Sequence, residues 1–131
     1  MRTWAWLPGF ALCLAIAAPR AQAVVTEDNF LVRTTGDLIE LCSATPSEAM
    51  YTAASNFCHG FAIGVFRVLQ AEDMARRSNH LFCLPDPAPT RNEALAGFVR
   101  WARADANRTA ERPADGIATF LSQQYPCPRG R

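Results

Sequence analysis

The chain has 131 residues, and its 13 basic residues, all of them arginine, nearly balance 12 acidic ones, for a formal net charge of +1. A chain of this length suits one small domain. The balance of charge argues against a polybasic surface, so neither nucleic acid nor anionic lipid is expected as a partner.

The first 23 residues have the pattern of a secretory signal peptide. Arg2 precedes a nearly uninterrupted apolar run over residues 4–18, and Ala21-Gln22-Ala23 places small residues at a cleavage site. The run is too short to span a membrane, and no later stretch is long enough. We therefore expect a signal peptide over residues 1–23, a single mature domain over residues 24–131, and no membrane insertion.

A short helix is expected over residues 37–44, capped by one of the two threonines that precede it. The next stretch, residues 45–77, is predicted to be one long helix that begins with a capping box, because Thr45 and Glu48 have the required spacing. Apolar residues then recur at three- and four-residue steps, which predicts one buried face. That face consists of Tyr51, Ala54, Cys58, Phe61, Val65, Val68 and Leu69.

Two glycines, Gly60 and Gly64, lie inside this predicted helix. Each lowers helix stability by about 1 kcal/mol relative to alanine. Because they are four residues apart, they leave a flat strip where the backbone of another helix can come close. We therefore predict that both glycines face another helix of the fold rather than solvent.

Beyond the long helix, residues 78–89 contain three prolines within five residues, which exclude regular structure there. A capping box at Thr90 begins a helix over about residues 91–106. A polar connection over residues 105–112 follows, and a proline opens a last helix over residues 113–124. Four helices without a convincing strand predict an all-α fold, a small four-helix bundle linked by disulfides.

The disulfides are predicted from the cysteines that remain after cleavage of the signal peptide. Four remain, and an even number in an exported protein predicts two bridges. They are Cys42, Cys58, Cys83 and Cys127. No Cys-x-x-Cys pair is present, so thioredoxin-like redox chemistry and the common zinc sites have no support, and we expect neither a metal nor another cofactor.

Four cysteines allow three pairings. If the long helix begins at Pro46, Cys58 lies about 18 Å along it. The residues between Cys42 and that helix span only about 14 Å, which disfavours a Cys42–Cys58 bridge. Pairing Cys42 with Cys83 would make the loop after the helix travel back nearly the whole helix length. We therefore predict Cys58–Cys83 and Cys42–Cys127, for which the loop returns only to mid-helix.

No set of residues has the pattern of a catalytic site, so we expect no enzymatic activity. His59 follows Cys58, but consecutive helical side chains point about 100° apart and do not form a nucleophile–base pair. Glu72 and Asp73 are adjacent at the polar end of the predicted long helix, where a solvated face explains them better than paired acid–base carboxylates.

The order of several short motifs resembles one known family. The motifs are Asp37-Leu38, Leu41-Cys42, Phe57-Cys58-His59-Gly60-Phe61, Gly64-Val65, Phe82-Cys83-Leu84-Pro85, Pro113-Ala114 and Tyr125-Pro126-Cys127. In this order, behind a signal peptide, they resemble the Rap/Tai family of immunity proteins. These proteins protect Gram-negative bacteria from peptidoglycan-cleaving effectors delivered by type VI secretion.

The resemblance implies a periplasmic, helical, disulfide-bonded protein that is often dimeric. Characterised members of the family bind and occlude an amidase effector and have no catalysis of their own. A cognate cell-wall amidase is therefore the expected partner, and a second copy of the chain is a possible one. The alternative is an orphan periplasmic helical protein with a chaperone or stress role, but four cysteines, dense aromatic residues and the absence of lysine favour immunity.

The polar connection over residues 105–112 is the candidate contact with that partner. The apolar stripes account for most of the hydrophobic residues, so a loop on a rigid scaffold remains for recognition. Arginine suits recognition of carboxylates through its bidentate fork. The candidate contact residues are Asp105, Asn107, Arg108 and Glu111.

Overall fold

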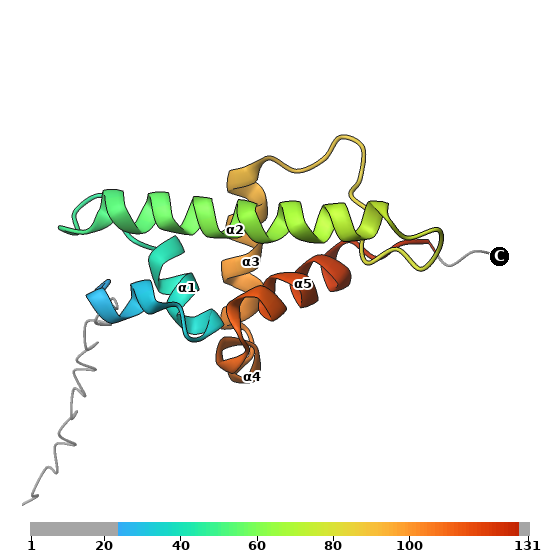
Figure 1. Ribbon diagram of the computed structural model, residues 1–131. Coiled ribbons are helices and arrows are strands. Elements are labelled where there is room, and N and C mark those ends of the chain that lie inside the picture. The colour runs from blue at the N-terminus through green and yellow to red at the C-terminus, as the bar shows by residue number, and fades with distance from the viewer. Residues whose placement is uncertain (1–23, 129–131) are drawn as a thin grey trace, which may run out of the picture.

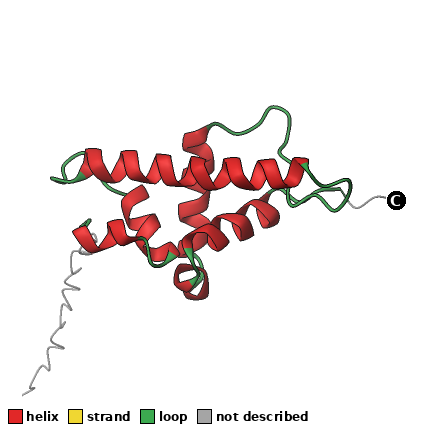
Figure 2. Cartoon of the chain, viewed as in Figure 1, coloured by secondary structure: helices red, strands yellow, loops and turns green. Residues whose placement is uncertain are grey.

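The structure, a computed structural model, describes residues 24–128 and contains helices but no strand over that range (Figure 1, Figure 2). A short 3-10 helix, η1 (Glu27–Leu31), precedes five α-helices. These are α1 (Thr35–Cys42), α2 (Tyr51–Met74), α3 (Arg91–Arg103), α4 (Ala106–Ala110) and α5 (Pro113–Gln124). The predicted all-α fold is confirmed, although α4 adds a helix to the four that were expected. The predicted signal peptide lies outside the described residues.

The long helix α2 lies along one side of the molecule, and the other helices are arranged beneath and across it (Figure 1). Both α1 and α5 pack against α2, and α3 crosses it while packing on α1 and α5. The short α4 lies at the end of α3 that points away from α2. This arrangement leaves much of α2 open to solvent.

The main core lies between α1, α3 and α5 and is centred on aromatic rings. The ring of Phe120 is 5.6 Å from that of Phe98, 5.8 Å from Trp101 and 6.1 Å from Tyr125. Aromatic pairs at these separations stabilise a core beyond the burial of their area. Tyr125 is partly buried against this core, and the remaining buried members of the core are Leu38, Ile39, Phe82, Ala102, Ile117 and Leu121.

The predicted apolar face of α2 is only partly buried. Ala54 and Cys58 are its buried members, and Val68 is 59% exposed. A Cβ atom built on Gly60 or on Gly64 would meet nothing within 4 Å. The prediction that these glycines face another helix of the fold is therefore wrong. On the α5 side, the residues that face the two glycines include Ala114 and Ala118, whose side chains are short. An open groove therefore remains between α2 and α5.

The helix α2 begins at Tyr51, not at Pro46 as predicted. One hydrogen bond of the expected capping box is present, in which the backbone N–H of Thr45 donates to Glu48 Oε1 at 2.7 Å, but the Glu48 N–H donates to the Thr45 carbonyl instead of its hydroxyl. However, the other carboxylate oxygen of Glu48 accepts from the backbone N–H of Val25 at 3.0 Å. These backbone donors hold the pKa of Glu48 below its ordinary value. These hydrogen bonds close a turn that contacts the N-terminal segment at Val25, and α2 begins only after this turn.

The disulfides join Cys42 to Cys58 and Cys83 to Cys127, with Cα–Cα distances of 5.1 Å and 4.8 Å. All four cysteines are bridged as expected, but the predicted pairing of Cys58–Cys83 with Cys42–Cys127 is wrong. The late start of α2 explains the error, because Cys58 then lies only about 10 Å along the helix, within reach of Cys42. Cys83 is held beside the C-terminal segment, where its N–H donates to the carbonyl of Tyr125 at 2.7 Å.

The first turn of α1 is in close contact with the start of α5. Thr35 is fully buried, and its backbone N–H donates to the carbonyl of Glu111 at 2.7 Å. A Cβ on Gly116 would come within 2.3 Å of Thr35 Oγ1, so only glycine permits this approach. Thr34 caps α1, and Thr90 forms the predicted capping box with Glu93 at the start of α3.

The glycines provide a test of this packing. Gly60→Ala and Gly64→Ala should each raise the free energy of unfolding by roughly 0.5–1 kcal/mol, because alanine is the better helix former and nothing obstructs its methyl group. Gly116→Ala is the matched substitution and should lower it by roughly 1–3 kcal/mol through collision with Thr35. Denaturant unfolding at a protein concentration at which each variant is monomeric measures all three. A loss of stability in Gly64→Ala would contradict the open face of α2.

Candidate functional site

The segment predicted to contact the partner contains the helix α4 and is tied to the core. Asp105 caps α4, with its Oδ1 accepting from the N–H of Asn107 at 2.9 Å. The guanidinium of Arg108 lies 4.5 Å from the centre of the Trp101 ring, and its Nη1 donates to the Trp101 carbonyl at 2.7 Å. Arg108 thus has a cation–π contact and a hydrogen bond inside the fold. The carbonyl of Glu111 accepts from α1, as described above.

Of the four predicted contact residues, only Asn107 is exposed, and the other three are half-buried. A substitution of Arg108 would therefore disturb the packing on Trp101 as well as any surface contact. Asn107 is the cleaner probe of binding at α4. In the sequence, the only indication of this contact is that Arg108 follows Trp101 by seven residues. That spacing alone does not predict stacking, because a helix break lies between the two residues.

A groove with a cavity volume of about 460 Å³ lies where α3 crosses α2 beside the end of α1. Its lining includes Tyr51, Ser55 and His59 from α2 and Asn92 and Arg100 from α3. The Nδ1 atom of His59 is buried and has no hydrogen-bond partner within residues 24–128. Sequence reasoning did not identify this groove, because its two walls are 30 or more residues apart in the chain.

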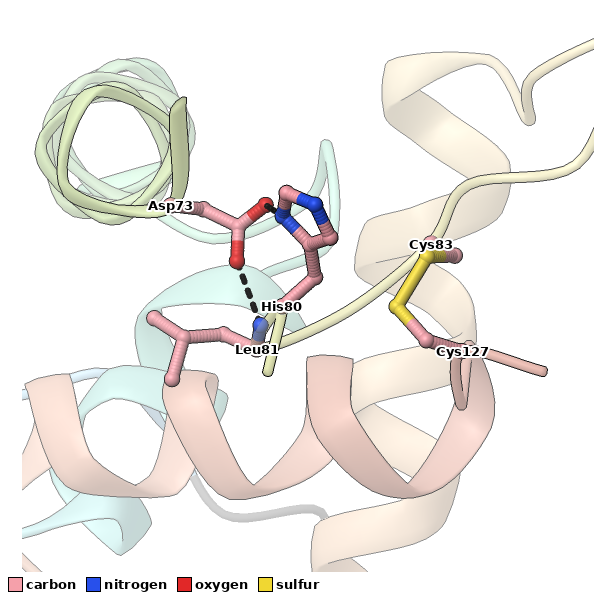
Figure 3. Close-up of a disulfide and its surroundings, with 5 residues drawn as sticks. All are labelled: Asp73, His80, Leu81, Cys83 and Cys127. Atoms are coloured by element: carbon pink, nitrogen blue, oxygen red, sulfur yellow. Dashed lines mark hydrogen bonds and ion pairs between the residues drawn. A yellow bond between two sulfur atoms is a disulfide. The ribbon is translucent and has the colours of Figure 1, made fainter. Parts of the chain in front are cut away.

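Asp73 binds the segment that follows α2, although the sequence pattern predicts that its side chain lies on a solvated face. Figure 3 shows the Asp73 carboxylate with one oxygen directed at the His80 ring and the other at the backbone nitrogen of Leu81, and the Cys83–Cys127 disulfide lies further along the same segment. Asp73 Oδ2 is 3.0 Å from His80 Nδ1, and Oδ1 accepts the Leu81 N–H. The Leu81 N–H, and then His80, hold the pKa of Asp73 below its ordinary 3.8.

No group of three or more histidine, cysteine or carboxylate side chains is gathered as a metal site within the described chain. The four cysteines of that range are all oxidised, so they offer no thiolate nucleophile there. Within residues 24–128 the structure presents a disulfide-linked surface with grooves.

Comparison with known proteins identifies the family. The family model described as Rap1a immunity proteins matches residues 34–127, from the cap of α1 to the last cysteine. The chain belongs to the Rap1a immunity protein family. No curated protein and no solved structure matches it.

Membership of the Rap1a family confirms the Rap/Tai resemblance and assigns an immunity role in type VI secretion. Rap1a immunity proteins are inhibitors rather than enzymes, and they are typically periplasmic. The role implies binding of a cognate effector. Within residues 24–128 no helix of this Rap1a protein is both long and apolar enough to cross a membrane.

The Asp73 contact leads to a prediction about pH. Because the pKa of Asp73 in the fold lies below 3.8, its carboxylate stabilises the Leu81 segment above that pH and loses the effect as the pH falls through the lower folded value. Asp73→Asn should speed hydrogen exchange of the Leu81 amide near pH 6, and its difference from wild type in thermal stability should shrink below about pH 3.8. Glu72→Gln is the neighbouring control and should leave both unchanged. A difference in thermal stability that is independent of pH would contradict this role.

Proposed function

We propose that this protein is a periplasmic immunity protein that binds a peptidoglycan amidase effector of type VI secretion and occludes its active site. The single observation that carries the proposal is the family match over residues 34–127, which spans α1 to α5 and both disulfides. Two disulfides also fit a chain that works in an oxidising compartment. The family match favours this role over a general chaperone or stress role.

We further propose that the exposed face of α4 is one contact with the amidase. Asn107 is the residue that would touch the partner, while Asp105 and Arg108 hold α4 in place by the cap and by the stacking on Trp101. Glu111 fixes the end of the segment through its carbonyl. A short helix fixed in this way presents its side chains with little loss of conformational entropy on binding.

A second copy of the chain is the other proposed partner. The open groove between α2 and α5 is lined by Gly60, Gly64 and Ala118, and the neighbouring Val68 is 59% exposed. Exposed apolar surface beside small residues allows two helices to pack closely across an interface. We therefore propose a homodimer in which this face of α2 meets its counterpart.

The proposed function is tested with purified residues 24–131 and cell-wall amidases, beginning with any that is encoded beside its gene. Wild type should bind the amidase with a micromolar or lower Kd and should stop release of peptide from peptidoglycan. Asn107→Trp should weaken binding by about tenfold or more without changing the melting temperature, because it adds bulk at an exposed contact. Gln124→Trp is the matched exposed control and should bind normally. If no cell-wall hydrolase of the host or of a rival binds wild type, the immunity function against such enzymes is wrong.

The homodimer is tested by analytical ultracentrifugation over a range of concentrations. Wild type should sediment as a dimer, and Gly64→Arg should shift it to a monomer because a charged side chain would be buried in the interface. Ala88→Arg places the same side chain on the exposed proline-rich loop and should leave the dimer intact. A wild-type protein that is monomeric at the highest concentration would contradict the homodimer.

A further inference from the structure

We propose that the groove between α1, α2 and α3 binds a carboxylate-bearing segment of the amidase effector, with Arg100 as the ion-pair partner of that carboxylate. The inference rests on the proposed function and adds a recognition surface separate from α4. It is carried by the arrangement of polar groups around an apolar floor, by the charge of the groove and by one unpartnered nitrogen.

The groove has two polar rows on either side of an apolar floor. Four-residue steps place Tyr51, Ser55 and His59 on one side of α2, and the same steps place Asn92 and Arg100 on one side of α3. The apolar residues that line the groove include Leu41, Cys42, Cys58, Leu95 and Val99. Such a site offers hydrogen bonds along both edges of a bound segment and apolar contact beneath it.

The positive charge of the groove favours a bound segment that carries a negative charge. Its lining contains Arg100 but no carboxylate. Arg103, one turn further along α3, lies 3.5 Å from Glu40, whereas no ion pair is formed by Arg100 within residues 24–128. An exposed guanidinium at the edge of an apolar floor pairs best with a carboxylate, which it can hold through two parallel hydrogen bonds.

His59 adds a specific requirement for a polar partner. Its Nδ1 is buried without a hydrogen bond in the described part of the chain, although the residue lines the groove. An unpaired buried polar atom is unfavourable, so pairing of this nitrogen with a group of a bound segment, once the ring turns toward the groove, would be favourable. Tyr51 and Arg100 belong to the residue types that most often dominate the affinity of protein interfaces.

The floor of the groove is fixed before any partner arrives. The Cys42–Cys58 bridge joins the end of α1 to α2 inside the groove, and Cys58 is 1% exposed. The capping box of Thr90 fixes the start of α3, which carries the other wall. A binding surface that is already rigid loses little conformational entropy when a segment binds.

The test measures how substitutions in the groove change the affinity of the purified protein for the amidase that wild type binds. Arg100→Glu should raise the Kd by about tenfold or more, and Tyr51→Ala should have an effect of similar size. Arg67→Glu makes the same charge change at an exposed residue of α2 that does not line the groove, and it should stay within about twofold of wild type. Replacing one carboxylate of the amidase by lysine should restore binding to Arg100→Glu and so identify the partner group.

The outcomes separate the two proposals. If wild type fails to bind the amidase, the proposed function is wrong and this inference falls with it. If wild type binds and both Arg100→Glu and Tyr51→Ala bind equally well, the groove is not a recognition site, while the proposed function stands. Melting temperatures establish that each variant is folded, and Arg100→Gln, which should also weaken binding, replaces any Arg100→Glu protein that is not.

Discussion

The fold depends on the close approach of α1 to α5 at Thr35 and Gly116. Because Gly116 has no side chain, the first turn of α5 can lie directly on the buried Thr35. Thr35 also binds the carbonyls of Glu111 and Arg112, which connect α4 to α5. This contact sets the position of α5, and Phe120 can then reach the rings of α3. The aromatic core and the stacked α4 are both consequences of that placement.

Placing the core between α1, α3 and α5 changes the role of α2. In a regular bundle the longest helix would bury a full stripe, but here it covers the other helices with one side and is open elsewhere. Its two faces become the walls of two grooves, one with α5 and one with α3. The surfaces proposed for a second copy of the chain and for the effector therefore come from the same helix, and the disulfide at Cys58 steadies it.

Local signals in the sequence were sufficient for most of the helices. The caps at Thr34 and Thr90 and the proline that opens α5 lie within a few residues of the groups they satisfy. Thr45 and Glu48 have the same local spacing but form a turn, and the Glu48 carboxylate also binds the distant N–H of Val25. That one error misplaced the start of α2 and with it both disulfides. The stacking of Arg108 and the groove around Arg100 depend on contacts across helix breaks, so sequence periodicity could not show them.

The connectivity of the bridges has a consequence for how the chain matures. The pairs are consecutive, Cys42 with Cys58 and then Cys83 with Cys127, and their loops neither nest nor interleave. When a chain emerges from its amino end, an oxidase that joins each cysteine to the next one available makes the native set directly. The first bridge closes a sequence separation of only 16, and both of its cysteines precede α3 in the chain. Such a protein can reach its oxidised form without a disulfide isomerase, which would matter to a cell that must have its protection ready before an attack.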